Sequence, residues 1–363
     1  GVALVAATTA YRTQNAKMGC YQSGPTYRKE PRNSAISRCF WAFNYIYACI
    51  KDCVLIDPCM GSGSLLLNAK KYAKEPEYIK YYGQELNTST YNLARMNMFL
   101  HGITPENQNL RNGDTLDGDW PTGEETDFHM VLMNPPYSAK WSAAVGFLQD
   151  ERFSDYGVLA PKSKADYAFL LHGLYHLKSN GTMAIVLPHG VLFRGAAEGK
   201  IREKLLRSGN IYAVIGLPAN LFYNTSIPTC IIVLKKHRDG RDVLFIDASK
   251  KFEKGKKQNA MTDDHIDEVL ELYSNRETVE KEAFLASFED IEKNDFNLNI
   301  PRYVDTFEKE EDVDLNALLT DMKKTDEELE QVQGEFLSLL KDLTSNDETI
   351  MSSLNDLIEK IEG

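Results

Sequence analysis

Between residue 50 and about residue 250, short runs of apolar, largely β-branched residues alternate with longer stretches of helical periodicity. Parallel strands need long crossover connections, usually helices, so this alternation is typical of a parallel sheet covered by helices. It predicts a doubly wound α/β fold, whose ligands bind at the carboxyl ends of the strands. The expected strands are 54–57, 78–85, 130–134, 182–188, 211–218, 229–236 and 242–248, and the expected helices are 63–74, 88–101, 165–178 and 196–208.

The pattern changes after residue 250. Residues 262–273 are typical of a capped amphipathic helix, with Thr262 at the N-cap and acidic residues in the first turn. From about residue 313, apolar residues recur at steps of three, four and seven in acidic sequence, which indicates a long helix or a helix pair with a coiled-coil-like seam. Such a seam either packs on its own domain or meets another chain, and its length favours another chain.

Composition limits the location and the partners of the chain. Its 363 residues, 43% of them hydrophobic, suffice for a large core. Neither an apolar run of roughly 20 residues nor a signal-peptide pattern occurs, so we expect a soluble, cytoplasmic protein with no membrane contact. Six cysteines without zinc spacings indicate reduced thiols and no metal. The net charge of −12 argues against a chain that holds nucleic acid alone, although a basic partner could deliver such a substrate.

A glycine-containing turn follows the first expected strand. The sequence VLIDPCMGSGSLLLNA places Asp57 at the strand end, then Gly61 and Gly63, then a helix whose N-terminus offers free N–H groups. Such a turn is weak evidence when it stands alone. Leu66 occupies the place of the third glycine of the dinucleotide fingerprint, which disfavours a nicotinamide-dependent oxidoreductase. We interpret Cys59, inside the turn, as a small residue lining a ligand pocket and not as a nucleophile.

Two further carboxylates follow at successive strand ends. Glu85 lies at the tip of the second strand, where an ionised carboxylate can accept hydrogen bonds from both hydroxyls of a ribose. Asp114 lies where a third strand should end, and it can accept the exocyclic amine of an adenine ring. Each acid alone is more often a helix N-cap. Their ordered appearance at three strand ends favours a nucleoside-containing ligand.

The stretch VLMNPPYSAKW ends an apolar run at Asn134, Pro135, Pro136 and Tyr137. The prolines cannot continue a sheet ladder, and they hold the next residues in an extended conformation. If the Asn134 carboxamide and the Pro135 carbonyl accept the two N–H hydrogens of an adenine amine, its nitrogen becomes electron-rich enough to attack a methyl group. Tyr137 would stack on the base after it is flipped from the helix. The alternative is a turn in which Asn134 acts as an Asx-type cap.

These segments carry a family resemblance. DPCMGSGSLLLNA, GQELNTSTYNLARMNMFLHG, NGDTL and VLMNPPYSAKW, in this order, resemble the amino-methyltransferases that use S-adenosylmethionine. Three longer stretches are similar to the modification subunit of type I restriction-modification systems: ADYAFLLHGLYHLKSNGTMAIVLPHGVLFRGAAEGKIREKLL, VIGLPANLFYNTSIPTCIIVLKK and NDFNLNIPRYVD. The resemblance runs from about residue 52 to residue 305. It implies a Rossmann-like methyltransferase sheet with a C-terminal helical extension, and methylation of adenine N6 in DNA.

The resemblance also implies how the cofactor is held. S-adenosylmethionine would place its methionyl part at Asp57 and at the backbone of Gly61 and Gly63, its ribose at Glu85 and its adenine at Asp114. No metal and no strongly shifted general base is required, because proximity and hydrogen bonds at the amine suffice.

A hetero-oligomer is implied as well. A separate DNA-specificity subunit would read the target sequence and recruit a restriction subunit. The expected parts are an N-terminal segment, 1–50, that is the remnant of a helical domain; a methyltransferase domain, 51–305; and a helical tail for partner contact, 306–363. Residues 24–37 depart from the aromatic-Thr-Pro element that this family carries before the glycine turn. Either the chain is truncated there or its pocket closes differently, so no cofactor contact is assigned to that segment.

Other functions remain open from the sequence. A protein glutamine methyltransferase uses N-P-P-Y in the same way, but the long stretches after residue 165 count against it. A non-catalytic scaffold would need neither Asn134 nor the acids at the strand ends.

Two groups of residues have competing interpretations. His172 and His176 lie one helical turn apart, a metal-ligand spacing, but no third ligand is evident and we interpret them as ordinary core or surface histidines. Arg194 either contacts a phosphate or forms a salt bridge with Glu198 one turn later.

Overall fold

The computed structural model describes residues 53–73, 75–122, 127–222, 225–256, 258–305 and 315–362. The expectations for residues 1–50 lie outside this set. Contacts divide the chain into two compact units, Gly1–Thr306 and Phe307–Gly363. Each unit is described by itself below.

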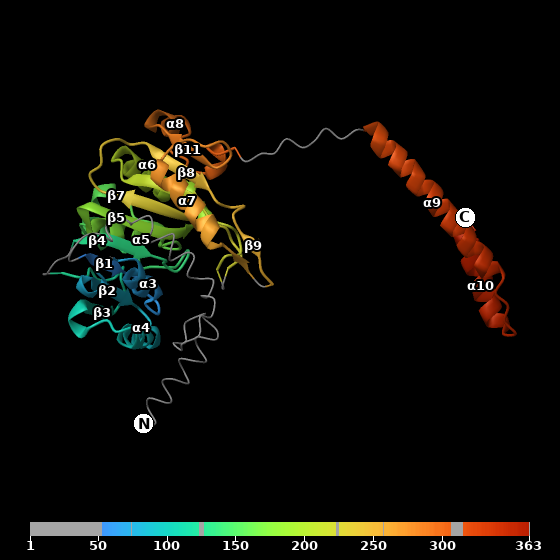
Figure 1. Cartoon of the computed structure of the whole chain (residues 1–363), viewed down its shortest axis with the longest axis horizontal. Helices are drawn as coiled ribbons and strands as arrows, with labels where there is room; N and C mark the ends of the chain where they lie inside the picture. Colours follow the sequence, from blue (N-terminus) through green and yellow to red (C-terminus); the bar gives the residue numbers. More distant parts are fainter. Residues whose placement is uncertain are drawn as a thin grey trace, which may run out of the picture. The chain divides into compact units, whose positions relative to one another are not determined.

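The first unit is built on a nine-stranded sheet, as far as the described residues extend (Figure 1). The strand order is β11-β8-β6-β7-β5-β4-β1-β2-β3. Strands β1 to β5 pair in parallel, and their carboxyl ends therefore share one edge. The strands are β1 Val54–Asp57, β2 Lys80–Glu85, β3 Gln108–Asn112, β4 Phe128–Met133, β5 Leu177–Pro188, β6 Ile211–Gly216, β7 Thr229–Lys235, β8 Val243–Asp247 and β11 Ala283–Ala286, and a separate pair is formed by β9 Glu253–Lys254 and β10 Asn259–Ala260.

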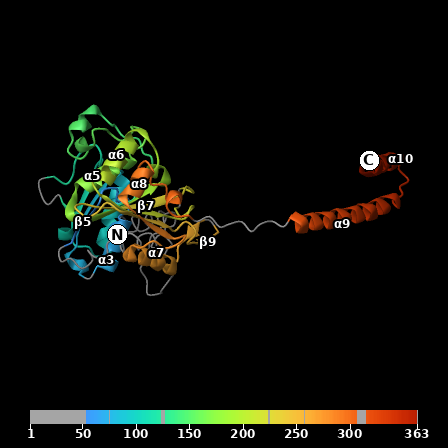
Figure 2. The ribbon, with the colours of Figure 1, turned by 90° about the horizontal axis from the view of Figure 1, so that it is seen from above.

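Helices cover both faces of this sheet. Figure 2 shows α5, α6 and α8 on one side and α3 and α7 on the other. Alternate strand residues supply two cores, since Ile56 belongs to the core under α5 and α6 whereas Leu55 belongs to the core under α3, α4 and α7. The predicted doubly wound α/β fold is thereby confirmed. The helices are α3 Ser64–Tyr72, α4 Thr88–Leu100, α5 Asp166–Tyr175, α6 Ala196–Arg207, α7 Asp263–Asn275 and α8 Phe288–Lys293, with short 3-10 turns at Pro76–Tyr78, Pro105–Asn107, Val145–Gln149, Ser154–Tyr156, His189–Leu192 and Ile300–Arg302.

Several features of the sheet differ from the prediction, and one of them is the edge strand β11, which was not expected and pairs antiparallel with β8. Strand β7 is antiparallel to both of its neighbours, β5 and β6, because a loop and not a covering helix joins β6 to β7. Strand β3 has no apolar run, since its sequence QNLRN is half-exposed to exposed, and it was not among the strands expected from apolar runs. Thr262 does cap α7, as predicted, and its side chain accepts the N–H of His265.

The second unit is a pair of helices, α9 Leu315–Lys341 and α10 Glu348–Glu362. The break between them falls at a polar turn, where Asp347 accepts the N–H of Thr349 at 2.9 Å and starts α10. Leu340 and Ile358 are buried, whereas most of the predicted seam is exposed. The exposed seam residues are Leu318, Met322, Leu329, Val332, Phe336, Leu339, Leu343, Ile350 and Leu357.

Among the described helices, none combines the length and the apolar character that crossing a membrane requires.

Candidate active site

The turn after β1 is shaped by Asp57 and two glycines. Asp57 is buried, and its Oδ1 accepts the N–H of Cys59 at 3.0 Å. Gly61 and Gly63 both adopt left-handed backbone, with φ of 54° and 80°, which side chains with a β-carbon rarely adopt. Gly63 is the N-cap of α3 and has no side chain that could accept a hydrogen bond from the first turn of the helix.

Glu85 links the end of β2 to this turn. Its Oε2 accepts the N–H of Gly61 at 3.1 Å, and its Oε1 accepts the N–H of Asn87 at 2.8 Å. Each carboxylate oxygen has a second lone pair, so Glu85 can still accept hydroxyl hydrogens from a ligand.

Asp114 lies two residues beyond β3, in a loop that is tied to the glycine turn. Its exposed side chain accepts the N–H of Leu116 at 2.9 Å, and the Thr115 hydroxyl donates to the Pro58 carbonyl at 2.5 Å. The buried Arg152 donates to the Thr115 carbonyl at 3.0 Å and to the Leu116 carbonyl at 3.3 Å. Sequence analysis did not identify Arg152, because nothing in its surrounding sequence marks a contact with a loop so distant in the chain.

The charges of the three carboxyl groups act on one thiol, that of Cys59. Burial, and then the charges of Asp57, Glu85 and Asp114, hold the pKa of Cys59 well above its ordinary value. The thiol is therefore protonated and unsuited to nucleophilic attack. Burial also raises the pKa of Asp57 to about 8, against the opposing hydrogen bond from Cys59 and with a smaller contribution from the charge of Glu85.

Asn134 follows directly after β4, at the same edge of the sheet. β4 pairs in parallel with β1 through Leu55 and Met130, so the turn after β1 and the residues after β4 are neighbours. The Asn134 side chain is exposed, Pro135 is buried and Pro136 is exposed. The strand thus presents a carboxamide to solvent on a proline-stiffened support.

Tyr137 is half-buried beside Asn134. Its hydroxyl donates to Asn134 Oδ1 at 2.9 Å, and its ring meets Phe222 edge to face with the ring centroids 6.2 Å apart. Burial raises the pKa of Tyr137, so the phenol is neutral. Phe222, in the loop between β6 and β7, is another contact that sequence analysis did not identify, because an isolated aromatic residue in a loop carries no pattern.

Arg194, for which the sequence left a phosphate contact and a salt bridge to Glu198 as alternatives, forms the salt bridge at 2.5 Å and a further one to Asp166 at 2.6 Å. Its guanidinium is thereby engaged by two buried carboxylates.

His172 and His176 have a third neighbour, Asp119, whose Oδ1 lies 2.7 Å from His176 Nε2. These three residues are the one group with metal-ligand distances in the described part of the chain. However, Arg152 donates to His172 Nδ1 at 3.1 Å, which places the ring proton on Nε2 and leaves no lone pair for a metal there. Burial, His176 and Arg152 lower the pKa of His172 well below its ordinary value, so its ring is neutral. We interpret the group as an interior polar network that anchors Arg152.

Comparison with known proteins supplies the context for this site. Residues 44–312 match the family model of N-6 DNA methylases. The methylase subunit of the type I restriction enzyme MpnII from Mycoplasma pneumoniae is 37% identical over 306 residues, which cover 81% of this chain and 56% of the relative. The MjaVII methylase subunit from Methanocaldococcus jannaschii is 33% identical over 312 residues, which cover 80% of this chain and 52% of the relative. The chain therefore spans about half the length of the curated relatives it matches.

A solved structure agrees with these relatives. The methyltransferase subunit of a type I restriction-modification system from Streptococcus thermophilus superposes with a TM-score of 0.74 and 65% sequence identity. The match covers 76% of this chain and 59% of that one.

Proposed function

Because this chain belongs to the N-6 DNA methylase family, we propose that it transfers the methyl group of S-adenosylmethionine to N6 of adenine in DNA, as the modification subunit of a type I restriction-modification complex. The observation that carries the proposal is the exposed Asn134 carboxamide, which stands on a proline-stiffened strand end beside the glycine turn after β1.

The residues around the glycine turn fit S-adenosylmethionine. The bound cofactor supplies an electrophilic sulfonium methyl group. Asp57 and the backbone at Gly61 and Gly63 would hold the methionyl part, and Cys59 would line the same pocket. The left-handed glycines, which have no side chain, suit a close approach of the ligand to the backbone. Glu85 would accept the ribose hydroxyls and Asp114 the adenine amine, since both carboxylates keep free lone pairs.

The N-P-P-Y segment, residues 134–137, would act on the substrate amine. Asn134 Oδ1 accepts the Tyr137 hydroxyl and has a second lone pair that would accept one amine hydrogen. The Pro135 carbonyl would accept the other hydrogen, and the lone pair of the amine nitrogen would then face the methyl group. Tyr137 would stack on the flipped base, and Pro136 would limit the movement of the segment. Rate acceleration rests on positioning and on these hydrogen bonds.

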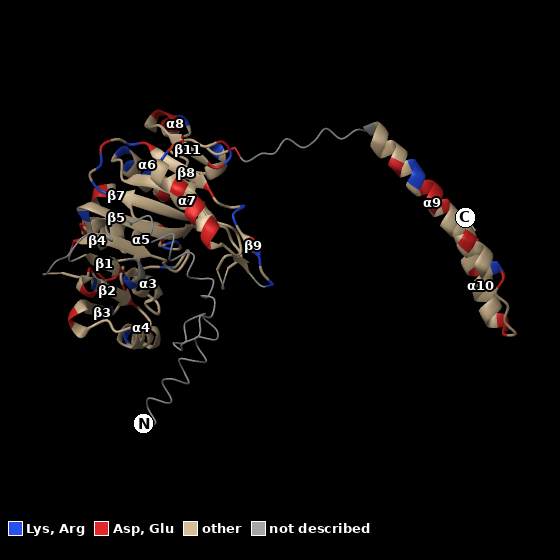
Figure 3. Cartoon of the chain, in the orientation of Figure 1, with Lys and Arg blue, Asp and Glu red and all other residues tan. Residues whose placement is uncertain are grey.

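The proposed partners are DNA, a DNA-specificity subunit and a restriction subunit, in a hetero-oligomer located in the cytoplasm. The net charge of −12 supports delivery of DNA by another chain, and Figure 3 shows acidic residues along α7. We assign residues 51–305 to the methyltransferase domain and 306–363 to partner contact through the exposed seam of α9 and α10.

Methyl transfer from labelled S-adenosylmethionine, by the chain together with its specificity subunit, tests the proposal. We expect label in DNA, and sequencing should locate it at N6 of adenine. Asn134→Ala should abolish transfer and leave cofactor affinity nearly unchanged, whereas Asp57→Ala should weaken cofactor binding. Label in a protein acceptor would instead identify a glutamine methyltransferase, and an empty calorimetric isotherm with the cofactor would identify a scaffold.

A further inference from the structure

The two residues after the N-P-P-Y segment are held by the start of α5. Ser138 has left-handed backbone, with φ of 51°, and its N–H donates to Asp166 Oδ1 at 2.7 Å. The N–H of Ala165 donates to the Ala139 carbonyl at 2.8 Å. A residue other than glycine rarely holds this conformation unless its surroundings impose it. These two hydrogen bonds are such a restraint.

Asp166 is itself fixed on its other side. Its carboxylate is fully buried, and Oδ2 accepts a hydrogen bond from Arg194 at 2.6 Å. Arg194 also donates to the buried Glu198, at 2.5 and 3.0 Å. Two buried acids thus share one guanidinium, and the Ser138 N–H supplies Asp166 with a further donor. A buried carboxylate with this much hydrogen bonding has little freedom to move.

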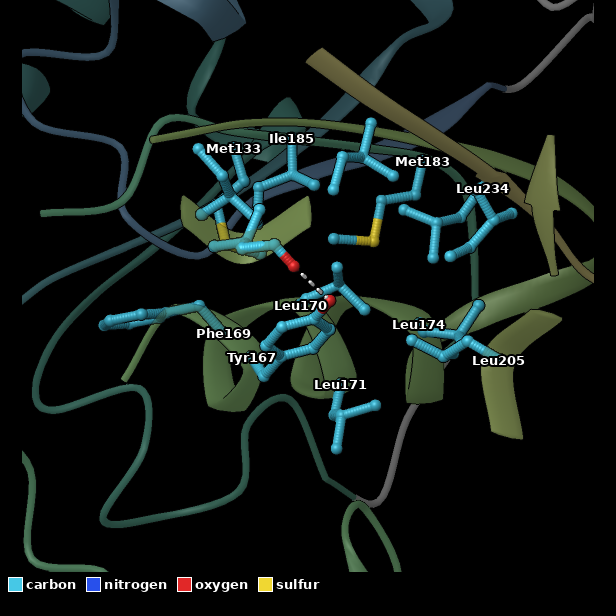
Figure 4. Close-up of a cluster of buried hydrophobic side chains, with 14 of the residues drawn as sticks. Met133, Tyr167, Phe169, Leu170, Leu171, Leu174, Met183, Ile185, Leu205 and Leu234 are labelled. Carbon is cyan, nitrogen blue, oxygen red and sulfur yellow. Dashed lines mark hydrogen bonds between the residues drawn. The ribbon is translucent and has the colours of Figure 1, made fainter. Parts of the chain in front are cut away.

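Helix α5, which carries Asp166, packs directly against the strand that carries Asn134. Figure 4 shows Tyr167, Leu170 and Leu174 of α5 facing Met133, Met183, Ile185 and Leu234 of the sheet. The approach is close, because a β-carbon at Gly173 would lie 3.0 Å from Met133 Cε. The same helix therefore contacts the chain just before the N-P-P-Y segment, at Met133, and just after it, at Ser138.

We propose that Asp166 is a positioning residue for methyl transfer: held by Arg194, it fixes the Ser138 backbone and thereby the placement of Asn134 and Tyr137 against the substrate amine. The proposal rests on the proposed function. The prolines stiffen the N-P-P-Y segment internally, and Asp166 restrains its downstream end. A misplacement of about 1 Å at a reacting group can cost about 100-fold in rate, so the loss of this restraint should appear in catalysis.

Single-turnover methyl transfer by the full chain with its specificity subunit tests the assignment. Asp166→Ala should lower the rate constant about 10- to 100-fold, while the dissociation constant for S-adenosylmethionine changes less than about 3-fold. Asp166→Asn should recover part of the rate, because its one amide oxygen can still accept the Ser138 N–H. Hydrogen exchange of the peptide spanning residues 134–139 should become faster in Asp166→Ala.

Glu198→Gln is the matched control. It disturbs the same buried ion cluster but has no bond to Ser138, so it should lower the melting temperature with less than about a 3-fold change in rate. Equal rate losses in Asp166→Ala and Glu198→Gln, or a full rate in Asp166→Ala, would overturn the positioning role while the proposed function stands. An unsubstituted chain that transfers no methyl group to DNA would refute the proposed function and this role with it.

Discussion

Burial keeps the carboxyl group of Asp57 largely protonated at neutral pH. Its pKa of about 8 lies above its ordinary value of 3.8. A raised carboxyl pKa means that ionisation opposes folding. This residue therefore lowers the free energy of unfolding progressively as the pH rises from about 4 through about 8. A cation bound beside Asp57 favours the ionised form and offsets that cost.

The raised pKa of Asp57 predicts that cofactor affinity depends on pH. The methionyl ammonium group would displace the Asp57 proton, so affinity should rise by up to about tenfold per pH unit between about pH 6 and about pH 7.5. Calorimetry across this range measures the dependence. Asp57→Asn should make the cofactor affinity nearly independent of pH. Asp247→Asn is the control, because Asp247 lies at the end of β8 and outside the proposed site, and it should leave the pH dependence unchanged. A pH-independent affinity in the unsubstituted chain would contradict the placement of the ammonium group.

At the residue scale, the sequence predicted the positions of those proposed site residues that lie at strand ends. Asp57, Glu85 and Asn134 each follow or end a parallel strand, and the carboxyl ends of such strands necessarily meet. Asp166 and Arg152 could not be found in this way. Their contacts are made to loops far along the chain, and only the packing of α5 and its neighbours brings them together.

At the scale of elements, apolar runs predicted the central strands well because both faces of these strands are buried. The same runs carry no information on direction, since a strand buried on both faces has the same pattern whether it is parallel or antiparallel. The orientation of β7 therefore emerged only from the structure. Helix starts were better marked, as at Thr262, because an N-cap is a local hydrogen bond that the sequence itself specifies.

The exposed seam of α9 gives a prediction for partner binding. Val332→Glu places a charge on the apolar stripe and should weaken binding of the specificity subunit by about 2 kcal/mol or more. Stability of the isolated chain should change by less than about 0.5 kcal/mol, since Val332 is 61% exposed. Calorimetric titration measures binding of the specificity subunit, and thermal unfolding measures the stability of the isolated chain.

Thr320→Glu is the matched control for this substitution. It adds the same charge to an exposed position on the opposite side of α9 and should bind the specificity subunit normally. Equal weakening by both substitutions would show that net charge, and not the apolar seam, governs the contact.

At the scale of the whole molecule, the acidic balance predicts weak DNA binding by this chain alone. With a net charge of −12, its affinity for duplex DNA should be no tighter than about 1 μM, with a shallow dependence on salt. Addition of the specificity subunit should tighten binding and steepen the salt dependence, because that subunit would contribute the phosphate contacts. Fluorescence anisotropy at about 50 and about 200 mM salt measures both the affinity for DNA and its salt dependence. Tight, steeply salt-dependent DNA binding by this chain alone would contradict the assignment of the phosphate contacts to the specificity subunit.

The polar character of β3 has a consequence for solubility. Among the strands that the structure describes, β3 is the last of the sheet, and none of them pairs with its outer edge. Arg111, which is exposed, adds a charge to this last strand. Margins of this composition resist pairing with the sheets of other molecules. The polar residues because of which β3 was not predicted as a strand should thus disfavour aggregation through pairing with strands of other molecules.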